Sequence, residues 1–122
     1  MNYGGKVLTD MEGLIRLLLP HCADRTTIDA LGQMLTDHKT WPKAHDLFNK
    51  IRAKTLVAER SGNRNAECQY LFEEICAKTL YNLSHSSAPF DPDSPYWIIP
   101  NALAFARKVG VTDAQVIEVV AA

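Results

Sequence analysis

Residues 68–83 read CQYLFEEICAKTLYNL, and this stretch decides the fold. Its apolar side chains recur three and four residues apart without a break, which is the spacing of one face of an α-helix. That face carries Cys68, Leu71, Phe72, Ile75, Cys76, Thr79, Leu80 and Leu83. The sequence therefore predicts a long helix here, with one side packed against the rest of the molecule.

Helix-start signals occur on both sides of this segment. The pairs Thr9–Glu12 and Thr112–Gln115 are capping-box patterns, in which a hydroxyl and a carboxyl or amide satisfy each other's backbone amides. Thr40 with Pro42 in the next turn is a third start signal, for a helix that runs to about Arg60. We expect a helix to begin at each of these three places.

Two more helices are expected, one beginning near Thr26 or Thr27 and one covering about 100–109, ended by Gly110. No stretch alternates apolar and polar residues with the period of a strand. A chain of 122 residues is one domain's worth of sequence. The sequence predicts a single all-α domain over residues 1–122, a compact bundle of five or six helices with a proline-rich loop near residues 84–95.

The charge balance limits the classes of function. The chain has 13 basic and 14 acidic residues, a formal net charge of −1, which argues against a dedicated nucleic-acid clamp. The charges are unevenly placed, because residues 41–64 hold six basic and two acidic side chains and residues 65–122 hold three and seven. A basic middle and an acidic C-terminal half are expected to give a dipolar surface.

The cysteines and the first twenty residues bear on the compartment. Cys22, Cys68 and Cys76 are an odd number at unpatterned spacing, which is typical of reduced thiols. The first twenty residues show no signal-peptide pattern, and the Leu17–Leu19 run is too short to span a membrane. We expect a cytoplasmic protein that does not contact a membrane.

Motifs for catalysis or metal binding are not found in the sequence. The His and Cys residues lack the paired spacing of a zinc site, and phosphate-loop and nucleophile-elbow patterns are absent. We therefore expect no metal, no cofactor and no enzyme activity. A small enzyme or ligand-binding bundle stays open as a third interpretation, which a polar pocket holding two or more of the four histidines would favour.

Protein contacts are predicted at two places in the acidic half. Tyrosines beside carboxylates form a rigid contact patch with charged flanks, and the 68–83 helix carries such a set opposite its apolar stripe. That set is Tyr70, Glu73, Glu74 and Tyr81. The proline-rich loop adds Phe90, Asp91 and Asp93. If Glu73 and Glu74 are surface contacts, reversing their charges should weaken partner binding far more than it lowers stability.

The 40–60 helix offers an alternative surface. Lys43, Lys50 and Lys54 lie along one flank and could track phosphates, which makes a nucleic-acid-associated module the alternative function. A nucleic-acid partner is not the expected one, because no aromatic residues interleave with these lysines. On the same helix, Ala53, Leu56 and Val57 fall away from the main apolar face. This second apolar set predicts a helix that is contacted on more than one side.

One segment resembles a known kind of protein. Residues 80–111, LYNLSHSSAPFDPDSPYWIIPNALAFARKVGV, are similar in style to small all-helical bacterial immunity proteins of contact-dependent growth-inhibition and related toxin systems. The resemblance implies a cytoplasmic protein that binds one cognate toxin domain, which in such systems is often a nuclease, and blocks its active site. Together with the patches above, it predicts protein–protein recognition without catalysis, with the toxin domain as the partner.

Overall fold

The computed structural model of the chain describes residues 3–85 and 98–121, and these residues fold as an all-α bundle. It contains six α-helices and two short 3₁₀ turns in the described part of the chain. The helices are α1 (Tyr3–Leu18), α2 (Thr26–Thr36), α3 (Ala44–Ser61), α4 (Arg64–His85), α5 (Ile98–Val109) and α6 (Asp113–Ala121). The turns are η1 (Leu19–His21) and η2 (His38–Lys43). The predicted fold class is confirmed, while the predicted loop beyond residue 85 lies outside the described residues.

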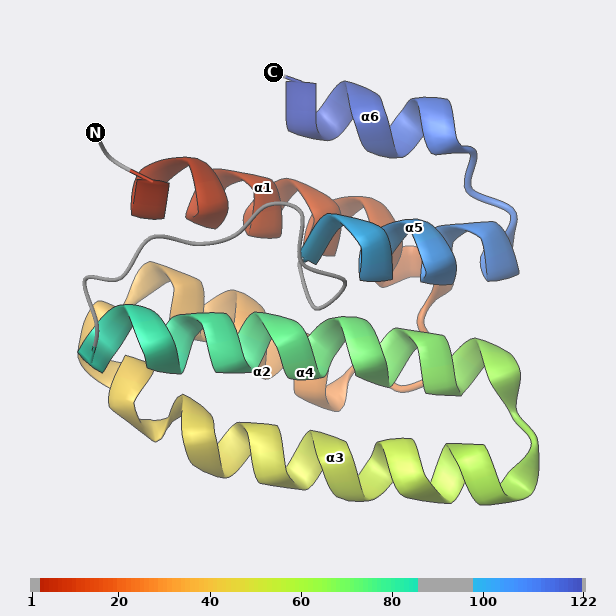
Figure 1. Cartoon of the computed structure of the whole chain (residues 1–122), viewed down its shortest axis with the longest axis horizontal. Helices are drawn as coiled ribbons and strands as arrows, with labels where there is room; N and C mark the ends of the chain where they lie inside the picture. The colour runs from red at the N-terminus through yellow and green to blue at the C-terminus, as the bar shows by residue number, and fades with distance from the viewer. Residues whose placement is uncertain (1–2, 86–97, 122) are drawn as a thin grey trace.

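The helices are stacked in layers, as Figure 1 shows. The long helix α4 lies in the middle, with α3 packed along one side and α5 on the other, and α2 also contacts it. On the far side of α5, α6 packs on α1 and α5. Consequently α4 is covered from several directions, whereas α3 and α6 lie at opposite edges of the bundle (Figure 1).

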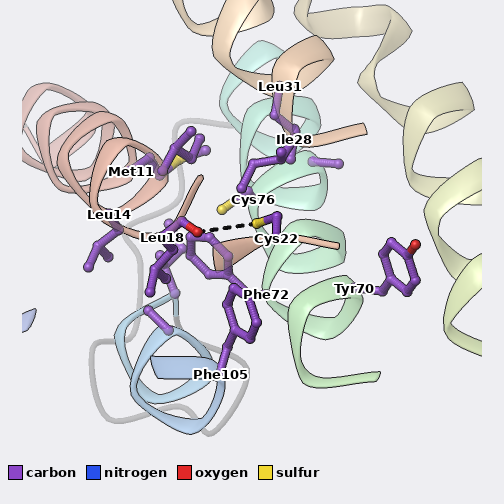
Figure 2. Packing of buried hydrophobic residues seen from close by; sticks show 14 of the residues in the cluster. Met11, Leu14, Leu18, Cys22, Ile28, Leu31, Tyr70, Phe72, Cys76 and Phe105 are labelled. Atoms are coloured by element: carbon purple, nitrogen blue, oxygen red, sulfur yellow. Dashed lines mark hydrogen bonds between the residues drawn. The ribbon is translucent and has the colours of Figure 1, made fainter. Parts of the chain in front are cut away.

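The hydrophobic core fills the space between α1, α2, α4 and α5. Phe72 of α4 and Phe105 of α5 are at most 1% exposed and lie close together beside α1 (Figure 2). The apolar residues of α1 and α2 that close this core are Met11, Leu14, Leu18, Ile28 and Leu31. The Cys22 thiol donates to the carbonyl oxygen of Leu18 at 3.4 Å, which fixes the chain between the two helices (Figure 2).

Helix ends follow local signals in part. Thr112 and Gln115 form the predicted capping box at α6, with the Gln115 amide donating to the Thr112 hydroxyl at 3.2 Å. The Asn63 side chain accepts from the Ala66 amide at the start of α4, and Gly62 ends α3 at a φ of 71°. Gly110 likewise has a φ of 85° after α5, as predicted.

Two predicted helix starts are wrong. Helix α1 begins at Tyr3, and the Thr9 hydroxyl donates inside the helix to the Gly5 carbonyl at 2.9 Å instead of capping it. The residues from Thr40 to Lys43 belong to η2, which is capped by the Asp37 side chain, and α3 begins at Ala44. Pro42 lies inside η2, and because its nitrogen cannot donate a hydrogen bond, the regular α-helical bonding of α3 begins only after it.

Candidate protein-binding site

Three of the predicted contact residues on α4 are buried. Tyr70 is 8% exposed, Glu73 0% and Glu74 5%, because this side of α4 faces α2 and α3 rather than solvent. Figure 2 shows Tyr70 on the side of α4 away from Phe72, directed toward α3. The expectation that these side chains form a surface patch is therefore wrong. The condition under which charge reversal at Glu73 and Glu74 would weaken partner binding more than stability is not met, because both carboxyl groups are buried.

Glu73 is the most deeply buried of these carboxyl groups. Its Oε1 accepts a hydrogen bond from the Thr27 hydroxyl at 2.5 Å, and its Oε2 accepts from the Gln69 amide at 3.3 Å. Burial raises the pKa of Glu73 to about 7, although both hydrogen bonds act in the opposite direction. Since both contacts are neutral donors, the group is held by hydrogen bonding rather than by an ion pair.

Asp24, in the turn before α2, anchors the neighbouring part of the same network. Its carboxylate accepts from the Lys54 ammonium at 2.7 Å, from the Tyr70 hydroxyl at 2.9 Å and from the Thr26 amide at 2.9 Å. These donors, Lys54 first, hold the pKa of Asp24 well below its usual range. The Asp24 carbonyl also accepts from Gln69 at 2.6 Å, so one turn joins α3 and α4 to the start of α2.

Glu74 completes the polar layer between α3 and α4. It accepts from the buried Thr55 hydroxyl at 2.6 Å and lies 3.5 Å from the guanidinium of Arg52. In the described residues no buried side-chain nitrogen or oxygen lacks a hydrogen-bond partner. We call the set Asp24, Thr27, Lys54, Thr55, Gln69, Tyr70, Glu73 and Glu74 the polar junction. It joins three helices and supplies structure rather than an accessible reactive group.

Tyr81 is the predicted contact residue of α4 that stays partly accessible. Its ring centroid lies 5.2 Å from that of His45 on α3 and 4.6 Å from that of His85 at the end of α4. His45 in turn stacks on Phe48 at 6.2 Å, and the Lys78 ammonium lies 5.6 Å from the Phe48 centroid. These rings form an aromatic surface at the α4 C-terminus. The loop residues Phe90, Asp91 and Asp93 lie outside the described residues.

The predicted lysine ridge is interrupted. Lys43 and Lys50 are exposed, but the Lys54 ammonium is bound to Asp24 in the polar junction. Its side chain is only 36% exposed. Two exposed lysines therefore remain of the three that were expected to track phosphates.

The outer face of α3 is the strongest candidate site. Leu56 is 40% and Val57 64% exposed, and Ala53 beside them is exposed as well. Lys50 and Arg60, both exposed, lie one turn before and one turn after this apolar group. We call Lys50, Ala53, Leu56, Val57 and Arg60 the α3 stripe.

Helical geometry accounts for the position of the α3 stripe. Ala44, Ile51, Thr55 and Ala58 are the buried residues of α3, and the stripe lies on the opposite side of the helix. The second apolar set was expected to be contacted from another side, yet Leu56 and Val57 are exposed in the folded chain. Together with the edge position of α3 in Figure 1, this leaves the stripe uncovered by the described part of the molecule.

A shallow groove of about 240 Å³ lies between α1 and α2. Leu8, Ile15 and Leu35 supply its apolar lining, and Glu12 and Arg16, paired at 2.7 Å, supply its charged lining. None of the four histidines of the third interpretation lines this groove. The thiols do not favour nucleophilic chemistry either, because burial raises the pKa of Cys22 to about 12 and that of Cys76 well above its usual value.

Two properties of residues 3–85 and 98–121 concern metal ions and membranes. No group of three or more His, Cys, Asp or Glu side chains is placed there to hold a metal ion. Nor is any helix in this part of the chain long and apolar enough to cross a membrane.

Comparison with protein-family models, with curated proteins and with solved structures finds no match to this chain.

Proposed function

We propose that this chain is a non-catalytic protein-recognition domain and that the α3 stripe is part of its contact surface. The supporting observation is the exposure of Leu56 and Val57 side by side on a regular helix with a basic residue at each end. Apolar side chains on a rigid element gain free energy when a partner removes them from water. Flanking charges fix the orientation of that partner and speed its approach.

The specific form that we propose is an immunity protein, which binds a cognate bacterial toxin domain and covers its active site. The resemblance of residues 80–111 to such proteins supports this choice. A preformed helical surface suits inhibition by occlusion, because a rigid surface loses little conformational entropy on binding. Tyr81, with its ring neighbours, is a second accessible surface on the same molecule for such a partner.

A capture experiment with matched variants tests the proposal. The tagged chain is incubated with nuclease-treated extract of its native host at physiological salt, and bound proteins are identified by mass spectrometry. The test variant is Leu56→Ser with Val57→Ser, and the control is Ile117→Ser, which alters a side chain 55% exposed on α6. A stoichiometric partner held by the wild type and the control, but lost by the test variant, is expected. Equal capture by all three chains would mean that the partner-binding surface does not include the α3 stripe.

The alternative is a nucleic-acid-associated module, and the exposure of Lys43 and Lys50 favours it. The apolar centre of the stripe and the ion pair between Lys54 and Asp24 favour a protein partner instead. A titration with labelled single- and double-stranded oligonucleotides separates the two. Phosphate binding weakens steeply as salt rises, because each neutralised phosphate releases counterions.

A further inference from the structure

Resting on the protein-recognition function proposed above, we propose that the α3 stripe receives an acidic amphipathic α-helix of the partner protein. The first reason is the shape of the surface. Exposed side chains at positions 50, 53, 57 and 60 follow the spacing of a single ridge along a helix. A second helix can place its own side chains in the grooves beside such a row. Helices that dock on other helices use anchor residues at this same spacing.

The length of the stripe sets the length of the partner segment. From Lys50 to Arg60 the helix rises ~15 Å, at about 1.5 Å per residue. Roughly three turns of a partner helix cover that distance. The partner is expected to present apolar residues at its centre, where Ala53, Leu56 and Val57 lie, and carboxylates about ten residues apart at the two ends.

Charge is the second reason. Lys50 and Arg60 end the stripe and are both exposed, whereas the Arg52 guanidinium beside it is already paired with Glu74 at 3.5 Å. Residues 41–64 contain six basic and two acidic side chains, and three of the basic ones are paired with carboxylates in the described part of the chain, which leaves Lys43, Lys50 and Arg60. Arginine and lysine at the rim of an apolar contact pair with carboxylates and repel basic partners. The partner surface is therefore acidic.

A second copy of this chain fits the stripe poorly. Antiparallel pairing of two α3 helices across a two-fold axis sets Lys50 of one copy near Arg60 of the other. Parallel pairing sets each of these residues near its own equivalent. Both arrangements bring like charges together at the two ends of the contact. The charge pattern thus selects a different, acidic chain over self-association.

Peptide probes test the chemistry of the partner directly. The probe is a capped helical peptide of about 18 residues, long enough to hold a helix, with leucines on one face and glutamates flanking them. A matched peptide carries lysines in place of the glutamates. Amide resonances of the labelled full chain are followed by NMR during titration. The acidic peptide is expected to shift the α3 resonances and to bind with a dissociation constant at least about tenfold lower than that of the basic peptide.

Charge variants of the chain identify the residues responsible. Lys50→Glu with Arg60→Glu is expected to weaken binding of the acidic peptide at least about tenfold. Lys39→Glu with Lys108→Glu makes the same change in net charge at exposed positions of η2 and α5, and is expected to leave binding within about threefold. Circular dichroism checks that each variant is folded.

Several outcomes would overturn this inference while leaving protein recognition standing. One is capture of a host protein that depends on Leu56 and Val57 but not on Lys50 and Arg60. Equal binding of both peptides, or no binding of the acidic one, is another. A dimer in light scattering that Leu56→Ser with Val57→Ser abolishes would assign the stripe to a second copy. Failure of the chain to capture any protein would instead contradict the proposed function itself.

Discussion

The two sides of the α3–α4 pair reverse the usual placement of polar and apolar residues. On the side of α4 that faces α2 and α3, Glu73 and Glu74 are at most 5% exposed, while on the outer face of α3, Val57 is 64% exposed. In the sequence, both helices carry apolar and polar residues at helical spacing. The difference shows that the neighbours of a helix, rather than its own residue pattern, decide which of its faces is buried.

The energetics of the two faces differ in kind. A buried carboxylate loses its hydration and requires donors inside the protein, which Thr27, Gln69 and Thr55 supply. An exposed Leu56 or Val57 costs little, since it meets water in the folded and the unfolded chain alike. Changes at the polar junction should therefore alter stability, and changes at the α3 stripe should alter binding.

The largest effect is expected from Glu73→Lys combined with Glu74→Lys. Each substitution buries a longer side chain and an unpaired ammonium where Thr27 or Thr55 now donates to a carboxylate. The free energy of unfolding should fall by more than about 4 kcal/mol, a large fraction of the stability of a typical domain. Far-UV circular dichroism and the soluble fraction after expression measure this loss.

A matched pair of surface reversals controls for net charge. Glu12→Lys with Glu118→Lys makes the same charge change at two exposed positions. It should cost no more than about 1 kcal/mol, the typical scale of an exposed ion pair. If the Glu73 and Glu74 variant folds as well as this control, the carboxylates are not buried and the comparison of the two faces fails.

The pH dependence of stability is the next largest effect. The pKa of Glu73 is about 7 in the folded chain and 4.5 at its ordinary value, so between these pH values the folded chain holds a proton that the unfolded chain has released. Stability due to this group therefore falls as the pH rises through that window. The loss reaches about 3 kcal/mol and is complete above pH 7.

Urea unfolding of the wild type and of Glu73→Gln at several pH values isolates this contribution. The amide does not titrate, so the difference in unfolding free energy should shift in favour of the variant between pH 4.5 and pH 7. Titration of other groups is common to both chains and cancels in the difference. A pH-independent difference would mean that Glu73 is ionised at all these pH values in the folded state.

Thr55→Val is expected to have an intermediate effect. It removes the hydroxyl that donates to the buried Glu74 carboxylate at 2.6 Å and leaves that acceptor short of a partner. The expected loss is about 1–3 kcal/mol in thermal or urea unfolding. The Thr55 hydroxyl also lies 3.1 Å from the Ile51 carbonyl, four residues back. Thr9→Val is the matched control, because the Thr9 hydroxyl bonds the Gly5 carbonyl in the same way but is exposed. Equal losses in the two variants would contradict a special role for the Glu74 contact.

Sequence periodicity predicted the fold class, because the apolar spacing of α4 and its neighbours has no strand-like alternative. The capping pattern was less reliable. Thr112 with Gln115 caps α6, whereas Thr9 with Glu12 lies inside α1. The two patterns are chemically alike. They differ in what precedes them, since Val7, two residues before Thr9, is 3% exposed and its packing extends the helix backward.

The site was harder to predict, because burial of the second face of α4 depends on contacts from distant parts of the chain. Gln69 and Glu73 meet Asp24 and Thr27 some 45 residues earlier, a pairing that local spacing does not encode. Ala77 lies on the same side of α4 and is fully buried. Its presence in the sequence does not indicate burial, because alanine is also the strongest helix former at exposed positions.

The smallest effect is expected from Val57→Ala on the α3 stripe. Alanine has the higher helix propensity and the valine is 64% exposed, so the free energy of unfolding should change by less than about 0.5 kcal/mol. Ile51→Ala, on the fully buried side of the same helix, should lose about 2–5 kcal/mol. Urea unfolding of the two variants compares the faces within one helix. A loss above about 1 kcal/mol at Val57 would mean that the chain itself covers this side chain, and the stripe would then not be available to a partner.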